Sequence, residues 1–285
     1  MKKVLVIGAK GMLGQEIVRV FGDTGNFEVM AWDRSNIDIT DFQQVQNKIP
    51  AIKPAILINC AAYNNVDGAE VEADAAYLLN AKAVENLAKV CKFTGITFVH
   101  YSTDYVFSGR ESAGYAEDAK PDPQSVYAKS KFAGEKAVQG VDGNFYLIRL
   151  SRLFGKPAES AKAKKSFVDI MLNLARTKSE IEVVDEEYAS PTYATDLAKA
   201  TLDILKFQSP FGIYHRTNDG ACTWFEFAKE IFRQTNMQTK VIPVRADKFL
   251  RPAARPKFSK LISTKLPTLR PWSEALKAYL DQAIL

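Results

Sequence analysis

Short apolar runs alternate with longer amphipathic stretches along the first half of the chain. Residues 4–7 form a continuous apolar run, which is typical of a parallel strand covered on both faces. The stretch that follows carries apolar residues at helical spacing, and the same alternation recurs up to residue 150. It predicts strands at 4–7, 27–32, 56–60, 96–101 and 145–150, and helices at 12–21, 42–49, 73–93 and around 127–131. This alternation predicts an α/β fold with a Rossmann-type doubly wound parallel sheet.

The pattern changes after about residue 151. It predicts helices near 166–177, 195–206 and 223–235, short strands near 181–184, 212–215 and 240–244, and a last helix after Pro271. Strands 181–184 and 212–215 are candidates to complete or extend the main sheet. We therefore expect a Rossmann domain over residues 1–150. Residues 151–285 should form mainly a smaller α/β substrate-binding lobe, with segments that can return to the main sheet.

Composition narrows the class of protein. The 285 residues are 47% hydrophobic and 25% charged, as in ordinary globular domains with a sizeable core. The net charge of +5 is too diffuse for a nucleic-acid-binding surface, and no apolar stretch approaches the ~18 residues of a membrane span. The N-terminus enters a strand at once, without a secretory signal. We expect a cytoplasmic protein, and we interpret the densest basic run, residues 162–165, as a solvated face or a helix start.

The cysteines and carboxylates give no sign of a metal site. Cys60, Cys91 and Cys222 are far apart and form no Cys-x-x-Cys pair, so neither a zinc site nor a disulfide framework is indicated. We predict no metal ligands from the sequence.

Three glycines follow the first strand and open the first helix. Gly8 would allow a tight turn, Gly11 would let the backbone approach a pyrophosphate, and Gly14 would permit close packing of the helix on the strand. Asp33 stands nineteen positions after Gly14, at the end of the second predicted strand. Together these features predict a dinucleotide-binding site.

The form of the dinucleotide stays open. Asp33 would accept hydrogen bonds from the adenosine ribose, which favours NADH, whereas Arg34 could pair with the extra phosphate of NADPH. Asp38 and Ile39 could flank the adenine, although Asp38 is equally well interpreted as a loop or helix-capping residue. The small residues of 59–63 would let the cofactor lie against the backbone, or they mark a tight strand-to-loop transition.

A phenol and an ammonium group stand four residues apart on one predicted helix, at Tyr127 and Lys131, and so share a face. A tyrosine hydroxyl titrates near pH ~10, and a neighbouring positive charge is expected to lower its pKa toward neutrality. Thr103, at the end of the preceding strand, could hydrogen-bond the same carbonyl oxygen. With a nicotinamide cofactor, these groups would interconvert a ketone and an alcohol. An isolated Tyr-x-x-x-Lys is usually a surface pair, but its place after a dinucleotide turn favours catalysis.

Several longer segments occur in order along nearly the whole chain. They are Gly8-x-x-Gly11-x-x-Gly14, Asn59-Cys60-Ala61-Ala62-Tyr63, Ser102-Thr103-Asp104-Tyr105-Val106-Phe107, Tyr127-Ala128-Lys129-Ser130-Lys131, Ser190-Pro191-Thr192 and Trp224-Phe225-Glu226-Phe227-Ala228. With them the chain resembles the extended short-chain dehydrogenase/reductases and, within them, the dTDP-4-dehydrorhamnose reductases.

The resemblance implies NAD(P)H-dependent reduction of the C4 ketone of dTDP-4-dehydro-6-deoxy-L-mannose to dTDP-L-rhamnose. It implies that Thr103, Tyr127 and Lys131 are catalytic, with Lys131 also holding the nicotinamide ribose. The residues implied to line the cofactor are Gly11, Met12, Leu13, Asp38, Ile39, Ala61, Ala62 and Tyr63. The residues implied to face the substrate are Thr103, Asp104, Arg251 and Arg255, with Arg245 as a further candidate.

The sequence departs from this family at the substrate side. Arg152 stands where members usually carry a tryptophan that packs on the substrate. An arginine there could pair with a phosphate or a more polar sugar, or the site has shifted to a related nucleotide sugar. Residues 185–189 also differ from the usual loop. Some members need magnesium, held by carboxylates at a dimer interface, but the sequence indicates no such site here. A homodimer is the candidate assembly, although no predicted helix has an apolar stripe that locates its interface.

Alternative functions differ in class. A related nucleotide-sugar 4-ketoreductase or an epimerase would use the same fold and cofactor. A non-catalytic dinucleotide-binding regulatory subunit is a third hypothesis, because a eukaryotic relative of the family, the β subunit of methionine adenosyltransferase, has that role. The presence of Thr103, Tyr127 and Lys131 together favours an enzyme. A dehydratase is disfavoured, because Asp104 is followed by Tyr105 rather than by a second acidic residue.

Overall fold

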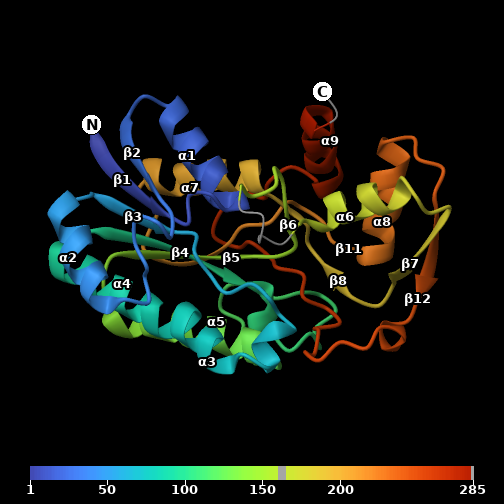
Figure 1. Cartoon of the computed structure of the whole chain (residues 1–285), viewed down its shortest axis with the longest axis horizontal. Coiled ribbons are helices and arrows are strands. Elements are labelled where there is room, and N and C mark those ends of the chain that lie inside the picture. Colours follow the sequence, from blue (N-terminus) through green and yellow to red (C-terminus); the bar gives the residue numbers. More distant parts are fainter. Residues whose placement is uncertain (160–164, 284–285) are drawn as a thin grey trace.

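A parallel sheet of six strands forms the centre of the computed structural model, which describes residues 1–159 and 165–283 (Figure 1). The strands lie in the order β2-β1-β3-β4-β5-β10, and every neighbouring pair is parallel. Their bounds are β1 (Lys2–Ile7), β2 (Phe27–Trp32), β3 (Ile56–Asn59), β4 (Thr97–Thr103), β5 (Phe145–Leu150) and β10 (Gly212–His215). The order reverses at β1, and sheets of this kind bind ligands beyond the carboxyl ends of the strands at such a point. The predicted doubly wound sheet is confirmed.

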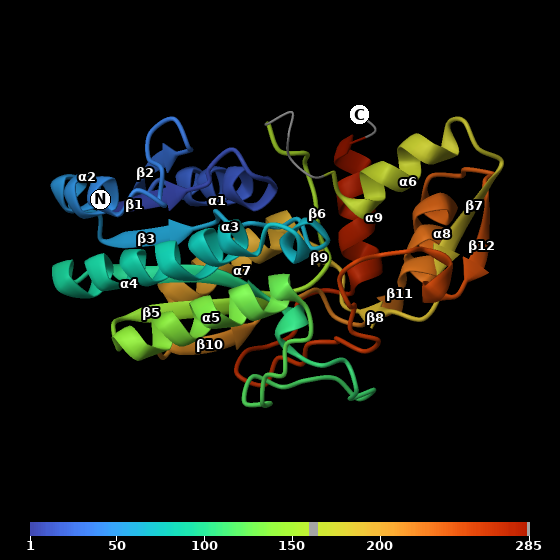
Figure 2. The ribbon, with the colours of Figure 1, turned by 60° about the horizontal axis from the view of Figure 1, so that its bottom comes forward.

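Helices cover both faces of this sheet (Figure 2). One face carries α1 (Met12–Asp23) and α7 (Ala194–Lys206), and the other carries α2 (Phe42–Ile52), α4 (Ala83–Thr94) and α5 (Val126–Val141). Alternate side chains of β1 divide between the two faces, with Val4 and Val6 toward α1 and α7, and Leu5 and Ile7 toward α2 and α4. All four are buried, which explains why this strand forms an uninterrupted apolar run in the sequence.

The long helix predicted over residues 73–93 contains a local change of winding. It consists of α3 (Ala73–Tyr77), the π-helical turn η2 (Leu78–Lys82) and α4. The buried Asn80 lies in the π turn, where its Oδ1 accepts a hydrogen bond from the Tyr63 N–H at 2.8 Å and its Nδ2 donates to Ser130 Oγ at 3.0 Å. Such single π turns are frequent at functional sites. Here the turn lets one side chain connect the loop after β3 with α5.

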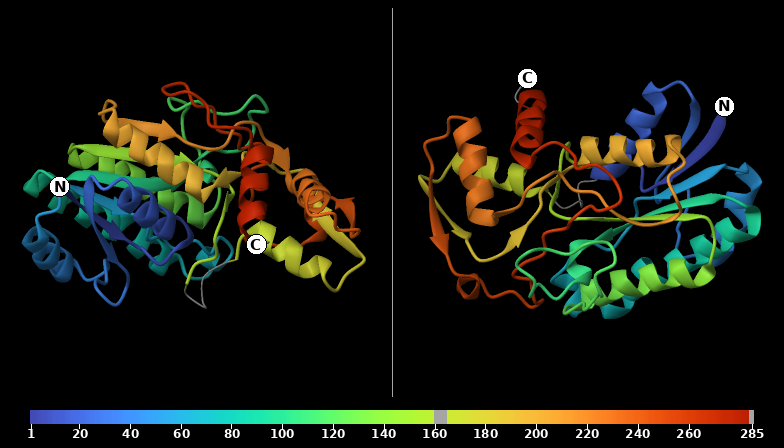
Figure 3. Two further views of the ribbon diagram at one scale, coloured as in Figure 1. Left: turned by 90° about the horizontal axis from the view of Figure 1, so that it is seen from above. Right: turned by 180° about the vertical axis from the view of Figure 1, so that it is seen from behind.

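The remaining elements form a smaller lobe beyond the carboxyl ends of the strands (Figure 3). Its core gathers aromatic and aliphatic side chains around Phe154, Phe227 and Tyr279. The lobe's helices and strands are β6 (Leu153–Phe154), α6 (Phe167–Ala175), β7 (Glu180–Val184), β8 (Tyr188–Ala189), β9 (Thr192–Tyr193), β11 (Cys222–Thr223), α8 (Trp224–Gln234), β12 (Lys240–Val244) and α9 (Trp272–Ala283). Short 3-10 turns occur at η1 (Gly68–Glu70), η3 (Asp104–Val106) and η4 (Ala246–Lys248).

Two segments predicted to extend the main sheet behave differently. Residues 212–215 form β10, which pairs with β5 at the sheet edge, and the preceding helix α7 packs against α1. Residues 181–184 do not join the sheet, so that expectation is wrong. They belong to β7, which pairs with β12 because Ile181 and Val183 pack into the lobe core against α8.

The basic run of residues 162–165 falls largely on a part of the chain that the structure does not describe. Residues 162–164 of the basic run lie outside the described residues, while α6 begins only at Phe167, after a capping box formed by Ser166 and Asp169. Within residues 1–159 and 165–283, no helix is long and apolar enough to cross a membrane.

Two glycines of α5 allow a matched test of this packing. A β-carbon at Gly134 would lie 2.1 Å from the carbonyl oxygen of Asn80. One at Gly140 would meet no atom of the described chain within 4 Å outside its own helix. We expect Gly140→Ala to raise the free energy of unfolding by ~0.5–1 kcal/mol, because alanine favours helix over glycine. Gly134→Ala should lower it by about 1–3 kcal/mol, because α5 must move away from η2. Urea denaturation measures both, and equal effects would contradict the tight contact.

Candidate active site

The glycine turn brings the ends of β1 and β3 into close contact. Gly8 has a φ of +78°, and a β-carbon there would lie 2.8 Å from the Ala61 nitrogen. A β-carbon at Gly14 would lie 2.2 Å from the Gly8 carbonyl oxygen. Gly11 is the N-cap of α1, and within the described residues no side chain caps this helix start. The first N–H groups of α1 can therefore bind a pyrophosphate, so the residues present fit a dinucleotide.

Asp33 forms an ion pair with Lys10 of the glycine turn. The N–H and the hydroxyl of Ser35 both donate to Asp33 Oδ1. Together with Lys10, these hydrogen bonds hold the pKa of the Asp33 carboxyl well below its usual range. Arg34 is 90% exposed and pairs with Asp38 at 3.4 Å. Two ion pairs, Lys10–Asp33 and Arg34–Asp38, thus stand at the predicted adenosine end of the site.

The other residues predicted at the adenosine end have local roles. Asp38 Oδ1 accepts hydrogen bonds from the N–H and hydroxyl of Thr40 within the loop before α2, whose N-cap is Asp41. Ile39 is 4% exposed and packs into the core beside α2. Ala61, Ala62 and Tyr63 are partly exposed along the loop after β3.

Thr103, Tyr127 and Lys131 come together from two elements. Thr103 ends β4, while Tyr127 and Lys131 lie one turn apart in α5. Ser125 fixes the start of that helix, because its side chain accepts a hydrogen bond from the Ala128 N–H at 3.3 Å. Tyr127 is 8% exposed and contacts the edge of the Tyr105 ring at a centroid distance of 6.0 Å. The Lys131 Nζ donates to the Tyr101 carbonyl oxygen at 2.7 Å.

The expectation that Lys131 lowers the pKa of Tyr127 is wrong for the chain on its own. Burial raises the pKa of Tyr127 to about 12, and the nearby Thr103 hydroxyl opposes this rise. The Lys131 ammonium is held by the Tyr101 carbonyl instead, and burial lowers its pKa to about 8. The phenol therefore stays protonated and can serve as a proton donor.

Asp104 is a buried carboxylate surrounded by hydroxyl groups. Its Oδ1 accepts from Thr103 at 3.0 Å, and its Oδ2 accepts from Ser151 at 2.7 Å and from Ser259 at 2.6 Å. Burial raises its pKa, and the three hydroxyl groups oppose that rise. Asp104 thus links the end of β4 to the end of β5 and to the chain segment of residues 251–261.

Arg152 has a φ of +43° and lays its guanidinium on the ring of Trp224, with the Cζ atom 3.9 Å from the ring centroid. Its Nη1 donates to the Cys222 carbonyl at 2.7 Å and its Nη2 to the Glu187 carbonyl at 2.6 Å. The tryptophan of α8 is therefore covered by a cation that binds backbone.

The other predicted phosphate ligands are also engaged. Arg251 pairs with Glu187, and Arg255 pairs with Asp67 at 2.7 Å. Asp67 Oδ1 also accepts from the Ala253 N–H at 3.2 Å, so it binds the 251–261 segment twice. Arg245 is exposed and pairs with its neighbour Asp247.

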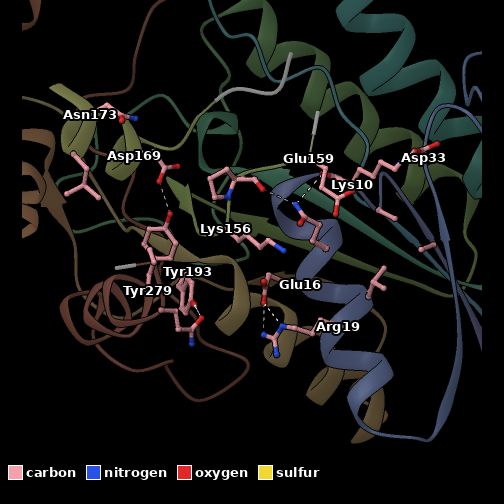
Figure 4. Close-up of a pocket in the computed structure, with 18 of the residues that line it drawn as sticks. Lys10, Glu16, Arg19, Asp33, Lys156, Glu159, Asp169, Asn173, Tyr193 and Tyr279 are labelled. Atoms are coloured by element: carbon pink, nitrogen blue, oxygen red, sulfur yellow. Dashed lines mark hydrogen bonds and ion pairs between the residues drawn. The ribbon is translucent and has the colours of Figure 1, made fainter. Parts of the chain in front are cut away.

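A groove of about 1030 Å³ lies between α1, α6 and α9 (Figure 4). Lys10 and Asp33 stand at one end, and Tyr193 and Tyr279 stand on the side of the lobe. Thr103, Tyr127 and Lys131 are not among the described residues that line it. The groove meets the predicted cofactor site only at the adenosine end.

The site contains residues that the motifs do not identify. Lys10 lies inside the glycine motif. Its position there is the only feature of the sequence that could have indicated its pairing with Asp33. Ser151, Ser259 and Asn80 act through contacts with residues distant in sequence, which no local pattern encodes. Within residues 1–159 and 165–283, no group of three or more His, Cys, Asp or Glu side chains could hold a metal ion.

Comparison with known proteins agrees with this geometry. The pattern of the family described as RmlD substrate binding domain matches residues 1–284. The chain belongs to this family. It is 37% identical over 286 residues to the spore coat polysaccharide biosynthesis protein SpsK of Bacillus subtilis (strain 168). This match covers 99% of this chain and 98% of SpsK.

Two further members of the family carry a reductase name. The dTDP-4-dehydrorhamnose reductase of Streptomyces griseus is 36% identical over 283 residues, covering 95% of this chain and 91% of that protein. The crystal structure of dTDP-4-dehydrorhamnose reductase from Bacillus anthracis str. Ames, in complex with NADP, has a TM-score of 0.92 at 37% identity. The match covers 99% of this chain and 100% of that one. The resemblance stated from the motifs is therefore confirmed.

The depressed pKa of Lys131 can be measured directly. In protein labelled at lysine, we expect one side-chain resonance to titrate near pH 8, well below the ordinary value of 10.5. Because the unfolded state binds the proton more tightly, this group makes the free energy of unfolding rise with pH between about 8 and 10.5. NMR titration of wild type and Lys131→Arg assigns the resonance. A resonance that titrates near 10.5 would contradict the burial of the ammonium.

Proposed function

We propose that this protein reduces the C4 ketone of dTDP-4-dehydro-6-deoxy-L-mannose to dTDP-L-rhamnose, with NADPH or NADH as reductant. The observation that carries the proposal is the meeting of Thr103, Tyr127 and Lys131 at the carboxyl edge of the sheet, the same edge that carries the glycine turn. Membership of a family that includes proteins named dTDP-4-dehydrorhamnose reductase supports the choice of substrate.

When bound, the nicotinamide cofactor supplies the hydride. The chain supplies the proton, which passes from the Tyr127 hydroxyl to the oxygen of the ketone as that oxygen becomes an alkoxide. In the chain alone the Thr103 hydroxyl donates to Asp104 at 3.0 Å. It would turn from this carboxylate to donate to the same oxygen of the ketone. The Lys131 ammonium, one helical turn from Tyr127, would hold the nicotinamide ribose. The burial of Tyr127 keeps water away from the transfer.

The segment 251–261 is the proposed binding surface for the diphosphate. Arg251 and Arg255 extend from it and pair with Glu187 and Asp67 in the chain alone. A substrate diphosphate would take over these pairs, because guanidinium groups bind phosphate oxygens in a bidentate way.

A second candidate substrate is another dTDP-4-keto sugar. The specific observation is Arg152, whose guanidinium covers Trp224 and places N–H donors where an apolar surface was expected. Such a wall favours a sugar with a further polar substituent near the ketone. The two candidates share the same chemistry at Tyr127 and differ only in the sugar.

The proposal extends to the setting of the enzyme. All three cysteines are free in the structure, which supports a reducing compartment such as the cytoplasm. A homodimer and the two-domain division at residue 150 stay predictions.

The decisive experiment follows nicotinamide oxidation with each dTDP-4-keto sugar, with NADPH or NADH, and with or without magnesium. We expect Tyr127→Phe to keep cofactor binding and to lower kcat by ~10²–10⁴-fold, because only the acid–base hydroxyl is lost. Cofactor affinity, measured by nicotinamide fluorescence, is the control for folding. Wild-type turnover in Tyr127→Phe would rule out the proposed proton donor. If neither sugar is reduced while the cofactor binds, the regulatory-subunit hypothesis replaces the enzyme.

The ion pair with Asp33 places Lys10 at the adenosine end of the site, so we predict that Lys10 binds the extra phosphate of NADPH. We expect Lys10→Met to lower kcat/KM for NADPH about tenfold or more, the usual scale for one charge-assisted hydrogen bond. Activity with NADH should be kept, because Asp33 is then free to accept the ribose hydroxyls. Arg34→Met is the matched variant. A larger change in the NADPH-to-NADH ratio there would assign the phosphate to Arg34 instead.

A further inference from the structure

A row of buried polar side chains lies between the sheet and α5. It runs across the carboxyl ends of three neighbouring strands, from Asn59 on β3 through His100 and Ser102 on β4 to Arg149 on β5. All four are at most 4% exposed. A polar row in this position is unexpected, because the same face of the sheet is apolar nearer the amino ends of the strands.

These side chains share the face that carries the catalytic helix. His100 stacks on Phe98, which belongs to the core beneath α4 and α5, at a centroid distance of 5.9 Å. Side chains alternate along a strand, so Ser102 lies on the same face as His100. Arg149, the register partner of Ser102, donates to Glu135 of α5 at 2.7 and 2.9 Å.

The hydrogen bonds fix the tautomer of His100. The Ala61 N–H donates to Asn59 Oδ1 at 3.1 Å, which sets the orientation of the amide. The Asn59 Nδ2 then donates to His100 Nδ1 at 3.3 Å, so Nδ1 is an acceptor. Burial and the charge of Lys131 hold the pKa of His100 well below its ordinary value, and the ring is therefore neutral. Its single proton is on Nε2.

Two atoms of this row have no partner. Neither His100 Nε2 nor Ser102 Oγ has a hydrogen-bond partner within the described residues. Buried polar atoms are nearly always bonded, to protein or to an internal water. The orphan pair therefore indicates a small polar ligand rather than a packing defect.

The Lys131 ammonium reaches the strand that carries this orphan pair. Its Nζ donates to the carbonyl of Tyr101, the residue between His100 and Ser102. The other charged or titratable groups around it are Glu135 one turn further along α5, Tyr127 one turn before it, and Arg149 across the sheet. An ammonium has three N–H groups, and one of them is used by Tyr101.

We propose that His100 Nε2 and Ser102 Oγ hold an internal water molecule against the Lys131 ammonium, and that His100 is a positioning residue for Lys131. The water accepts hydrogen bonds from His100 Nε2–H and from Lys131 Nζ–H, and it donates to Ser102 Oγ. Three polar partners are what a buried water needs. The importance of this site for turnover rests on the role proposed above for Lys131, but the water site itself does not.

The water has two effects on the ammonium. It gives Lys131 a second hydrogen-bond acceptor inside the protein, which favours the charged form. It also fixes the ammonium from two directions, so that the remaining N–H points toward the cofactor and Tyr127. Without the water, Lys131 would lose its proton at lower pH.

The water can be detected without any assay of activity. The chain has two histidines, so nitrogen-labelled histidine gives a simple spectrum, and the variant His215→Phe assigns it. We expect His100 to stay neutral, with its proton on Nε2, as the pH falls through the ordinary histidine value of 6.5. That proton should show magnetisation transfer from a long-lived water. A proton on Nδ1, or no such transfer, would overturn the proposal.

The effect on Lys131 is tested with three variants and one control. His100→Phe keeps the stacking on Phe98, Ser102→Ala removes the second contact, and the third variant combines them. We expect His100→Phe to lower the pKa of Lys131 by about one pH unit, as for the loss of one charge-assisted hydrogen bond. The alkaline limb of kcat/KM should shift by the same amount. The double variant should shift little further than His100→Phe, because one water serves both residues.

Tyr101→Phe is the matched control. Its hydroxyl bonds Thr201 at 2.8 Å on the opposite face of the same strand, and its carbonyl remains. This variant should leave the pKa of Lys131 unchanged. An unchanged pKa in His100→Phe, additive shifts in the double variant, or an equal shift in Tyr101→Phe would each overturn the proposal. If the ketone is not reduced at all, the NMR results still decide the water site.

Discussion

The close approach of the Gly8 backbone to the Ala61 backbone is the constraint on which the site depends. A β-carbon at Gly8 would lie 2.8 Å from the Ala61 nitrogen, so the turn after β1 and the loop after β3 are in direct contact. The Ala61 N–H in turn orients Asn59, and Asn59 orients His100 under the catalytic helix. The glycine turn and the His100 ring therefore belong to one continuous arrangement. A substitution at the glycine turn would therefore also displace the side chains of Asn59 and His100.

A second constraint acts where the lobe meets the sheet. Asp104 is 2% exposed, and an isolated carboxylate at that depth would be very costly. Hydroxyl groups from three separate segments satisfy it, so the carboxylate can stay buried only when β4, β5 and the 251–261 segment are assembled. Correct docking of the substrate lobe thus positions Thr103 as well.

The sequence predicts the sheet and the common helix face of Tyr127 and Lys131, because both leave local patterns. A strand that is buried on both faces of the sheet is apolar at every position, so it appears as a continuous apolar run in the sequence. Tyr127 and Lys131 are separated by one helical turn. The placement of 181–184 could not be predicted, because pairing with β12 depends on burial against α8 far along the chain. The orientation of Arg152 could not be predicted either, since Trp224 and the carbonyl oxygens that bind it come from other segments. The pKa of Tyr127 depends on burial and on the direction of one lysine side chain, and neither is written in residue spacing.

The return of α7 and β10 to the sheet has a consequence for how the chain is made. The strand β5 ends at Leu150, but its outer neighbour β10 begins only at Gly212, after the chain has passed through part of the lobe. During synthesis, the edge of β5 stays without its final partner until some sixty further residues have left the ribosome. Segments of the sheet and of the smaller lobe therefore alternate along the chain. The sheet gains its last strand only after part of the lobe has been synthesised.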